Sequence, residues 1–138
     1  MNSADCIRLS FPVNPAYVSS ARLTVSSIAN RIRFDIDEIE EIKTAVSEAC
    51  TYIIKRSATS DGNNFEICFV PKDREMSVEI VAQDTKDDDL IATEEMSLMM
   101  IKALVDEFSI IKPSQDQISI TMVKKHKETL FDYNEPSL

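Results

Sequence analysis

Residue types that often carry chemistry are few in this chain of 138 residues, and they are scattered. The single histidine, His126, lies in a short basic stretch with no assignable nucleophile or orienting acid, so a solvated side chain is expected. Cys6, Cys50 and Cys68 show neither Cys-x-x-Cys nor Cys/His spacing. This pattern predicts reduced, mostly buried thiols in a cytoplasmic protein and no zinc site.

Phosphate and metal chemistry would need either a glycine-rich loop or a suitably spaced acidic loop. A glycine-rich loop binds phosphate because its backbone N–H groups can approach the ligand without a Cβ in the way. Gly62 is the only glycine, so the chain has no such loop. The acidic run Asp87-Asp88-Asp89 lacks the ligand spacing and the glycine of known calcium loops. We therefore expect a solvated acidic turn there and no bound metal.

The overall charge limits the class of partner. The 15 basic and 24 acidic residues give a formal charge of -9, which repels a nucleic-acid backbone. The short basic stretches 55–56 and 124–127 lie near the ends of predicted elements and are expected to be solvated. No apolar run is long enough to cross a bilayer, and residues 1–10 lack the features of a signal peptide. A cytoplasmic protein that binds neither nucleic acid nor membranes is expected.

Hydrophobic periodicity predicts the elements that would position any site. Alternating apolar and polar residues indicate strands, and apolar spacings of three and four indicate helices. The predicted order is β-α-α-β-β-α-β-β, with strands at 7–13, 65–70, 76–82, 109–111 and 118–123, and helices at 14–32, 35–53 and 93–108.

The second predicted helix carries the clearest signal. Asp35 can cap it, Glu38 completes a capping box, and one apolar stripe runs to Ile53 opposite an acidic face. The element order predicts an α+β two-layer sandwich, with a mixed, mostly antiparallel sheet and three helices on one face. A single domain over residues 1–127 and a polar tail over 128–138 are expected.

Two motifs on the first two helices carry a family resemblance. The second helix reads Ala45-Val46-Ser47-Glu48-Ala49-Cys50-Thr51, and Arg22-Leu23-Thr24 lies on the helix before it. With these residues the chain resembles the anti-sigma-factor serine kinases of Gram-positive bacteria, within the histidine kinase/Hsp90-like ATPase superfamily, from about residue 7 to 125. The resemblance implies an ATP-bound dimer that sequesters a sigma factor and phosphorylates an antagonist protein on serine.

The resemblance also assigns roles within a nucleotide pocket. Glu48 matches the general base, but Tyr52 stands where the family has the asparagine that holds Mg²⁺. A neutral phenol is a poor Mg²⁺ ligand, and its ring would occupy space in the pocket. Asp84 matches the aspartate that reads the adenine amino group, and Lys86 replaces the glycine that follows it. Any remaining binding is therefore expected to be weak and adenine-like.

The phosphate end of the pocket departs further from the family pattern. Glu95 and Ser97 replace the two glycines of the Gly-x-Gly turn, and the short connection after Asp84 leaves no room for the family's lid. Ser119 keeps the hydroxyl of a Gly-x-Thr motif whose glycine is replaced by Gln117. Phosphoryl transfer depends on positioning and charge neutralisation, so we expect neither kinase activity nor an ATP/Mg cofactor.

The resulting prediction is a regulatory protein that binds a sigma factor, its antagonist or a kinase-competent relative, and that forms a homodimer. Arg22 on the first helix is a candidate partner contact. Met99 and Met100 cannot both point inward on an ideal helix, so at least one is expected to be exposed and available to a partner. Two alternatives stay open: a divergent ATP-dependent serine kinase that still uses Glu48 and Asp84, and a small-molecule sensor with a remodelled pocket.

Overall fold

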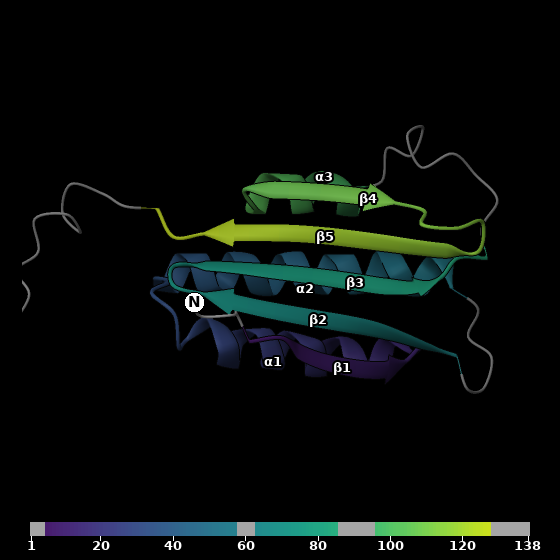
Figure 1. The fold of residues 1–138 in the computed structure, drawn as a ribbon, viewed down its shortest axis with the longest axis horizontal. Coiled ribbons are helices and arrows are strands. Elements are labelled where there is room, and N and C mark those ends of the chain that lie inside the picture. The colour runs from purple at the N-terminus through teal and green to yellow at the C-terminus, as the bar shows by residue number, and fades with distance from the viewer. Residues whose placement is uncertain (1–4, 58–62, 86–95, 128–138) are drawn as a thin grey trace, which may run out of the picture.

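The structure, a computed structural model, describes residues 5–57, 63–85 and 96–127. One sheet forms a layer, and three α-helices lie together on one of its faces (Figure 1). This arrangement confirms the predicted α+β two-layer sandwich. The elements are β1 (Ile7–Pro12), a 3₁₀ turn η1 (Pro15–Tyr17), α1 (Val18–Ala29), α2 (Ile36–Arg56), β2 (Asn64–Lys72), β3 (Glu75–Gln83), α3 (Met96–Leu104), β4 (Glu107–Ile111) and β5 (Gln117–Lys125).

The sheet has the strand order β1-β2-β3-β5-β4, and every strand pair is antiparallel across the described residues. The central pair, β3 and β5, runs in register from Glu75 opposite Lys125 to Gln83 opposite Gln117. β4 pairs only with β5 and therefore forms an edge. The ends of β3 and β4 and the beginning of β5 consequently meet at one end of the sheet, where the candidate site lies.

Helix α2 begins as the sequence predicts. The Asp35 side chain accepts a hydrogen bond from the Glu38 N–H at 2.8 Å, and the Asp35 N–H donates to Glu38 Oε1 at 2.9 Å. The helix continues three residues beyond the predicted end, to Arg56, because Ile54 and Arg56 are buried as well as Ile53. Because of this extension, the flank of α2 that holds residues four apart, such as Tyr52 and Arg56, reaches the end of the sheet.

The core lies between the helices and the inward face of the sheet. Alternate strand residues supply that face, among them Phe65, Phe69, Ile80 and Ile120, all of which are fully buried. The opposite face of the sheet is not covered by any of the three helices (Figure 1). Any site between helices and sheet must therefore be lined by residues from the inward face.

The third helix is shorter than predicted. Helix α3 ends at Leu104, and Phe108 lies on β4, directly opposite Met122 of β5. Phe108 and Ile110 alternate along that strand and pack against the core, so strand pairing overrides the helical spacing of the apolar residues. The predicted helix start at Thr93 lies outside the described residues.

The basic stretch after β5 is also different from the expectation. Lys124 is buried, and its Nζ lies 2.8 Å from Glu41 Oε1 and 2.6 Å from the carbonyl oxygen of Leu104. His126 Nδ1 lies 2.7 Å from Glu38 Oε1, and both side chains are buried. The prediction of solvated side chains was wrong for these two residues because the acidic face of α2 lies against them. No helix in the described ranges is long and apolar enough to span a membrane.

Candidate functional site

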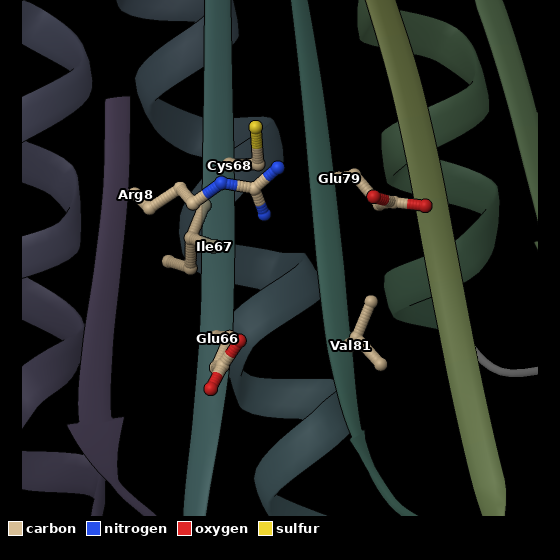
Figure 2. A pocket seen from close by; sticks show the side chains of 6 residues that line it. All are labelled: Arg8, Glu66, Ile67, Cys68, Glu79 and Val81. Atoms are coloured by element: carbon tan, nitrogen blue, oxygen red, sulfur yellow. The ribbon is translucent and has the colours of Figure 1, made fainter. Parts of the chain in front are cut away.

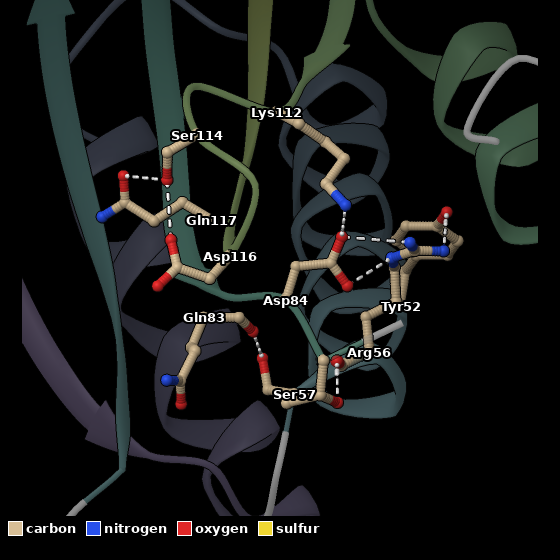
Figure 3. Close-up of polar contacts among 10 residues, drawn as sticks. Tyr52, Arg56, Ser57, Gln83, Asp84, Lys112, Ser114, Asp116 and Gln117 are labelled. Atoms are coloured by element: carbon tan, nitrogen blue, oxygen red, sulfur yellow. Dashed lines mark hydrogen bonds and ion pairs between the residues drawn. The ribbon is translucent and has the colours of Figure 1, made fainter. Parts of the chain in front are cut away.

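Four side chains form a polar cluster at the end of the sheet, which we call the Asp84 cluster: the buried Tyr52, Arg56 and Asp84, and the half-buried Lys112 (Figure 3). Arg56 is the last residue of α2, Asp84 directly follows β3, and Lys112 directly follows β4. Three segments that are distant in sequence therefore meet at one carboxylate.

The carboxylate of Asp84 is held by two cations. Arg56 donates from Nε to Oδ1 at 3.1 Å and from Nη2 to Oδ2 at 3.0 Å, and Lys112 Nζ lies 3.1 Å from Oδ2. The Asp84 side chain has 0% exposure and that of Arg56 has 5%, so the bidentate pair is shielded from water. Both oxygens of Asp84 are thus engaged by cationic side chains of the chain itself.

Tyr52 completes the cluster from one turn earlier on α2. Its side chain is buried, and its hydroxyl oxygen accepts a hydrogen bond from Arg56 Nη1 at 3.4 Å. The Arg56 Cζ lies 5.7 Å from the centroid of the Tyr52 ring, within range of a cation–π contact. The phenol therefore supports the guanidinium of Arg56, and its ring packs within the core.

Backbone hydrogen bonds fasten the same three segments. The carbonyl oxygen of Arg56 accepts from both the N–H and the hydroxyl of Thr85, at 2.9 and 2.8 Å. The N–H of Asp84 donates to the carbonyl oxygen of Asp116 in the connection between β4 and β5, at 2.8 Å. The side-chain cluster consequently sits on a backbone framework that fixes the positions of its members.

The structure brings some of the predicted pocket residues together and separates others. Tyr52 and Asp84 meet in the cluster through Arg56, as described above. Glu48 is half-buried one turn before Tyr52, and it has no hydrogen-bond or ion-pair partner in the part of the chain that the structure describes. Ser97 is buried in the first turn of α3, which packs against α2.

Ser119 lies on the other face of the sheet. Its neighbours Ile118 and Ile120 point into the core, whereas its hydroxyl faces Glu79 Oε2 at 3.4 Å. The structure therefore does not place this hydroxyl with the Asp84 cluster. The predicted pocket residues Lys86 and Glu95, and the run 87–89, lie outside the described residues.

Arg56 and Lys112 are the site residues that sequence reasoning missed. The stretch Lys55-Arg56 was expected to be a solvated helix end, which holds for the exposed Lys55 and is wrong for Arg56. The helical period contained the signal, because Arg56 lies four residues after Tyr52 and therefore on the same flank of α2. No comparable sequence signal singles out Lys112, which reaches Asp84 only through the pairing of β4 with β5.

The proposed contact residues are at least partly accessible. Met99 and Met100 are exposed, with 61% and 38% of their surface accessible, which confirms that they do not both pack inward. Arg22 is half-buried on α1, and its Nη1 donates to the hydroxyl of Ser47 on α2 at 3.3 Å. Arg22 is therefore anchored against the neighbouring helix.

A shallow depression of about 30 Å³ opens on the uncovered face of the sheet (Figure 2). This volume is far below the several hundred Å³ of a typical small-molecule site. Burial and, to a lesser extent, the neighbouring Cys6 together raise the pKa of the Cys68 thiol to about 11, which disfavours a reactive thiolate. The depression is lined by Arg8, Glu66, Ile67, Cys68, Glu79 and Val81.

Asp35, Glu38 and His126 are the one set of three possible metal ligands that come together within the described ranges. Burial alone would raise the pKa of Glu38, but hydrogen bonds from His126 and from the N–H groups of Lys127 and Asp35 outweigh it, so the pKa is lowered. These carboxylates already cap α2 and hold the segment after β5. The hydrogen bonds among Asp35, Glu38 and His126 thus explain why the three side chains lie together: they hold the start of α2 to the segment after β5.

Comparison with known proteins places this fold in a family. A family model described as a histidine kinase-like ATPase domain matches residues 11–124, which is most of the chain. The chain belongs to this family.

Curated relatives of this histidine kinase-like ATPase domain include several proteins named serine-protein kinase RsbW. That of Bacillus subtilis is 45% identical over 62 residues, or 45% of this chain and 39% of the relative. That of Bacillus licheniformis is 39% identical over 85 residues, or 62% and 53% respectively. That of Oceanobacillus iheyensis is 43% identical over 67 residues, or 49% and 42%. These matches confirm the resemblance to serine kinases and span about half of each relative's length.

Proposed function

We propose that this histidine kinase-like ATPase domain is an anti-sigma-factor-like regulatory protein that binds a sigma factor or its antagonist without phosphorylating it. The similarity to serine-protein kinases supports the regulatory setting. The burial of Asp84 beneath Arg56 carries the second half of the proposal, because it removes the carboxylate that would hold a nucleotide base.

The chemistry of phosphoryl transfer supports the same conclusion. Transfer needs metal ions and cationic groups arranged around the phosphates, with the nucleophile in line. Tyr52 presents a buried phenol, already hydrogen-bonded to Arg56, in place of an amide ligand for Mg²⁺. Arg56 and Lys112 are paired with Asp84, so their charge is directed at a carboxylate of the chain itself.

A phosphotransfer assay tests the absence of kinase activity. The chain would be incubated with Mg²⁺, γ-labelled ATP and the serine-containing antagonist protein from its own organism, beside the Bacillus subtilis relative with its own substrate. We expect label in the antagonist only with the relative. Stoichiometric labelling by this chain, abolished by Glu48→Gln, would favour the second candidate function, a divergent serine kinase.

The second candidate draws support from Glu48, whose half-buried carboxylate has no hydrogen-bond or ion-pair partner in the described part of the chain.

The helix layer is the proposed binding surface, with Arg22 on α1 and the exposed Met99 and Met100 on α3 as contacts. Flexible methionine side chains suit an adaptable protein contact. We propose that the chain acts in the cytoplasm as a homodimer, or as a heterodimer with a kinase-competent relative. Light scattering after size-exclusion chromatography would measure which of these assemblies forms.

A matched pair of surface variants tests the contact surface. Met99→Ser removes an apolar side chain with 61% exposure on α3, and Ile111→Ser removes one with 54% exposure on the edge strand β4. We expect Met99→Ser to weaken binding to the purified sigma factor or antagonist roughly tenfold, the effect of losing a partly buried contact residue. Equal effects of both variants, or none for Met99→Ser, would remove α3 from the binding surface.

A further inference from the structure

We propose that Arg56 is a built-in ligand of the chain: its guanidinium occupies the place beside Asp84 that the family resemblance assigns to a nucleotide base. This inference rests on the proposed function, because it explains how the degenerate site remains filled. It adds a specific occupant, the Arg56 guanidinium, and a consequence, namely that this side chain links the end of α2 to the residue after β3.

Arg56 uses all three nitrogens of its planar guanidinium. Its Nε and Nη2 donate two parallel hydrogen bonds to the two oxygens of Asp84, at 3.1 and 3.0 Å. Its third nitrogen, Nη1, donates to the Tyr52 hydroxyl, and the Arg56 Cζ lies 5.7 Å from the centroid of the Tyr52 ring (Figure 3). A guanidinium pairs with a carboxylate more strongly than a neutral base does, because both partners carry charge.

Arg56 also fastens the segments that a ligand in this place would bridge. Its side chain links α2 to the residue after β3, and its carbonyl oxygen accepts two hydrogen bonds from Thr85. Lys112 brings the residue after β4 to the same carboxylate. One residue therefore connects the end of α2 to the end of β3 through both its side chain and its backbone.

Neighbouring cations do not share this role. Lys55 is exposed, and the Lys112 side chain is 24% exposed and makes one contact to Oδ2 against the two of Arg56. Removal of the Arg56 side chain should thus leave a cavity with a carboxylate wall and a phenol wall, suited to a small planar cation. The Lys55→Ala variant removes the same charge from the adjacent position and leaves that site filled.

Chemical rescue tests the proposal. The melting temperature of Arg56→Ala would be measured without additive, with about 20 mM ethylguanidinium, and with the same concentration of ethylammonium. At this concentration neither additive denatures the protein. We expect the variant to melt on the order of 10 °C below the wild type. Ethylguanidinium should recover roughly 4 °C if it binds with a Kd of about 2 mM, and ethylammonium should recover less.

The controls separate a specific site from a general salt effect. Ethylguanidinium should not raise the melting temperature of the wild type or of Lys55→Ala, whose sites are filled. Arg56→Lys, which retains a charged side chain in the cavity, should melt below the wild type and gain nothing from ethylguanidinium. Equal gains in all variants, or no gain for Arg56→Ala, would overturn the proposal.

A variant that fails to fold still gives an answer. If Arg56→Ala is unfolded by circular dichroism, the proposal expects ethylguanidinium to restore helical signal, and failure to do so counts against it. These measurements contain no nucleotide, so a failed rescue leaves the proposed function untouched. Conversely, phosphotransfer by the wild-type chain would contradict the proposed function whatever the rescue shows.

Discussion

Neutralising Asp84 should destabilise the fold severely, because Asp84 is the carboxylate on which Arg56 and Lys112 converge. The change Asp84→Asn keeps the side chain's shape but leaves the buried guanidinium of Arg56 without its counter-ion. Breaking a buried ion pair by removing one partner costs about 3–5 kcal/mol. That is a large fraction of the 5–15 kcal/mol by which domains of this kind are usually stable.

Urea denaturation, with the free energy of unfolding and its urea dependence fitted together, measures the effect. Asp73→Asn is the matched control, because Asp73 pairs with Arg33 at 3.8 Å while both side chains are more than two-thirds exposed. Exposed pairs contribute about 0–1 kcal/mol, so this variant should unfold almost as the wild type does. The double variant Asp84→Ala/Arg56→Ala should lose clearly less than the sum of its single variants, because it removes both charges.

A loss below about 1 kcal/mol for Asp84→Asn, equal to that of Asp73→Asn, would refute this reasoning. It would mean that Asp84 is not held by a buried pair and remains available to a ligand. Additive losses in the double variant would likewise show that Arg56 and Asp84 do not interact.

Three further predictions concern the rest of the domain. The folded pKa of Glu38 is lowered from 4.5, so its contribution to stability is present above that value and is lost as pH falls through the folded pKa. In an acid unfolding series, the wild type should therefore lose more stability below pH 4.5 than Glu38→Gln does. In thiol titration with a disulfide reagent, the exposed Cys6 should react first. Cys50 should react only on unfolding, because burial raises the pKa of its thiol to about 12, and early reaction of Cys50 would contradict its burial. Lys124→Ala should cost about 1–3 kcal/mol in urea denaturation because it leaves the Leu104 carbonyl oxygen and Glu41 without their partner. Removal of the exposed neighbouring side chain by Lys125→Ala should leave the unfolding curve nearly unchanged.

The sequence was sufficient for the fold because local signals and the global arrangement agree. The capping box of Asp35 and Glu38, and the apolar stripe that follows it, predicted α2 before any packing was known. The predicted bounds of all five strands lie within two residues of those in the structure. Phe108 was placed in a helix because its spacing fits both element types, and only its pairing with Met122 decides between them.

The candidate site was predicted in part. The family resemblance brought Tyr52 and Asp84 to attention, and the structure places them in one cluster. The resemblance gave no indication of Arg56 or Lys112. A basic residue at a helix end is usually solvated, and the burial of Arg56 depends on the carboxylate of Asp84, 28 positions away. The same limit explains His126, whose partner on α2 is 88 positions away.

Titration calorimetry of the wild-type chain with Mg-ATP and with ADP tests the central claim, that side chains of the chain itself fill its nucleotide site. The Bacillus subtilis relative, measured under the same conditions, shows that the assay detects binding. The account predicts no saturable binding to this chain tighter than about 100 μM, or roughly -5.5 kcal/mol. Saturable binding of either nucleotide below that concentration would contradict it.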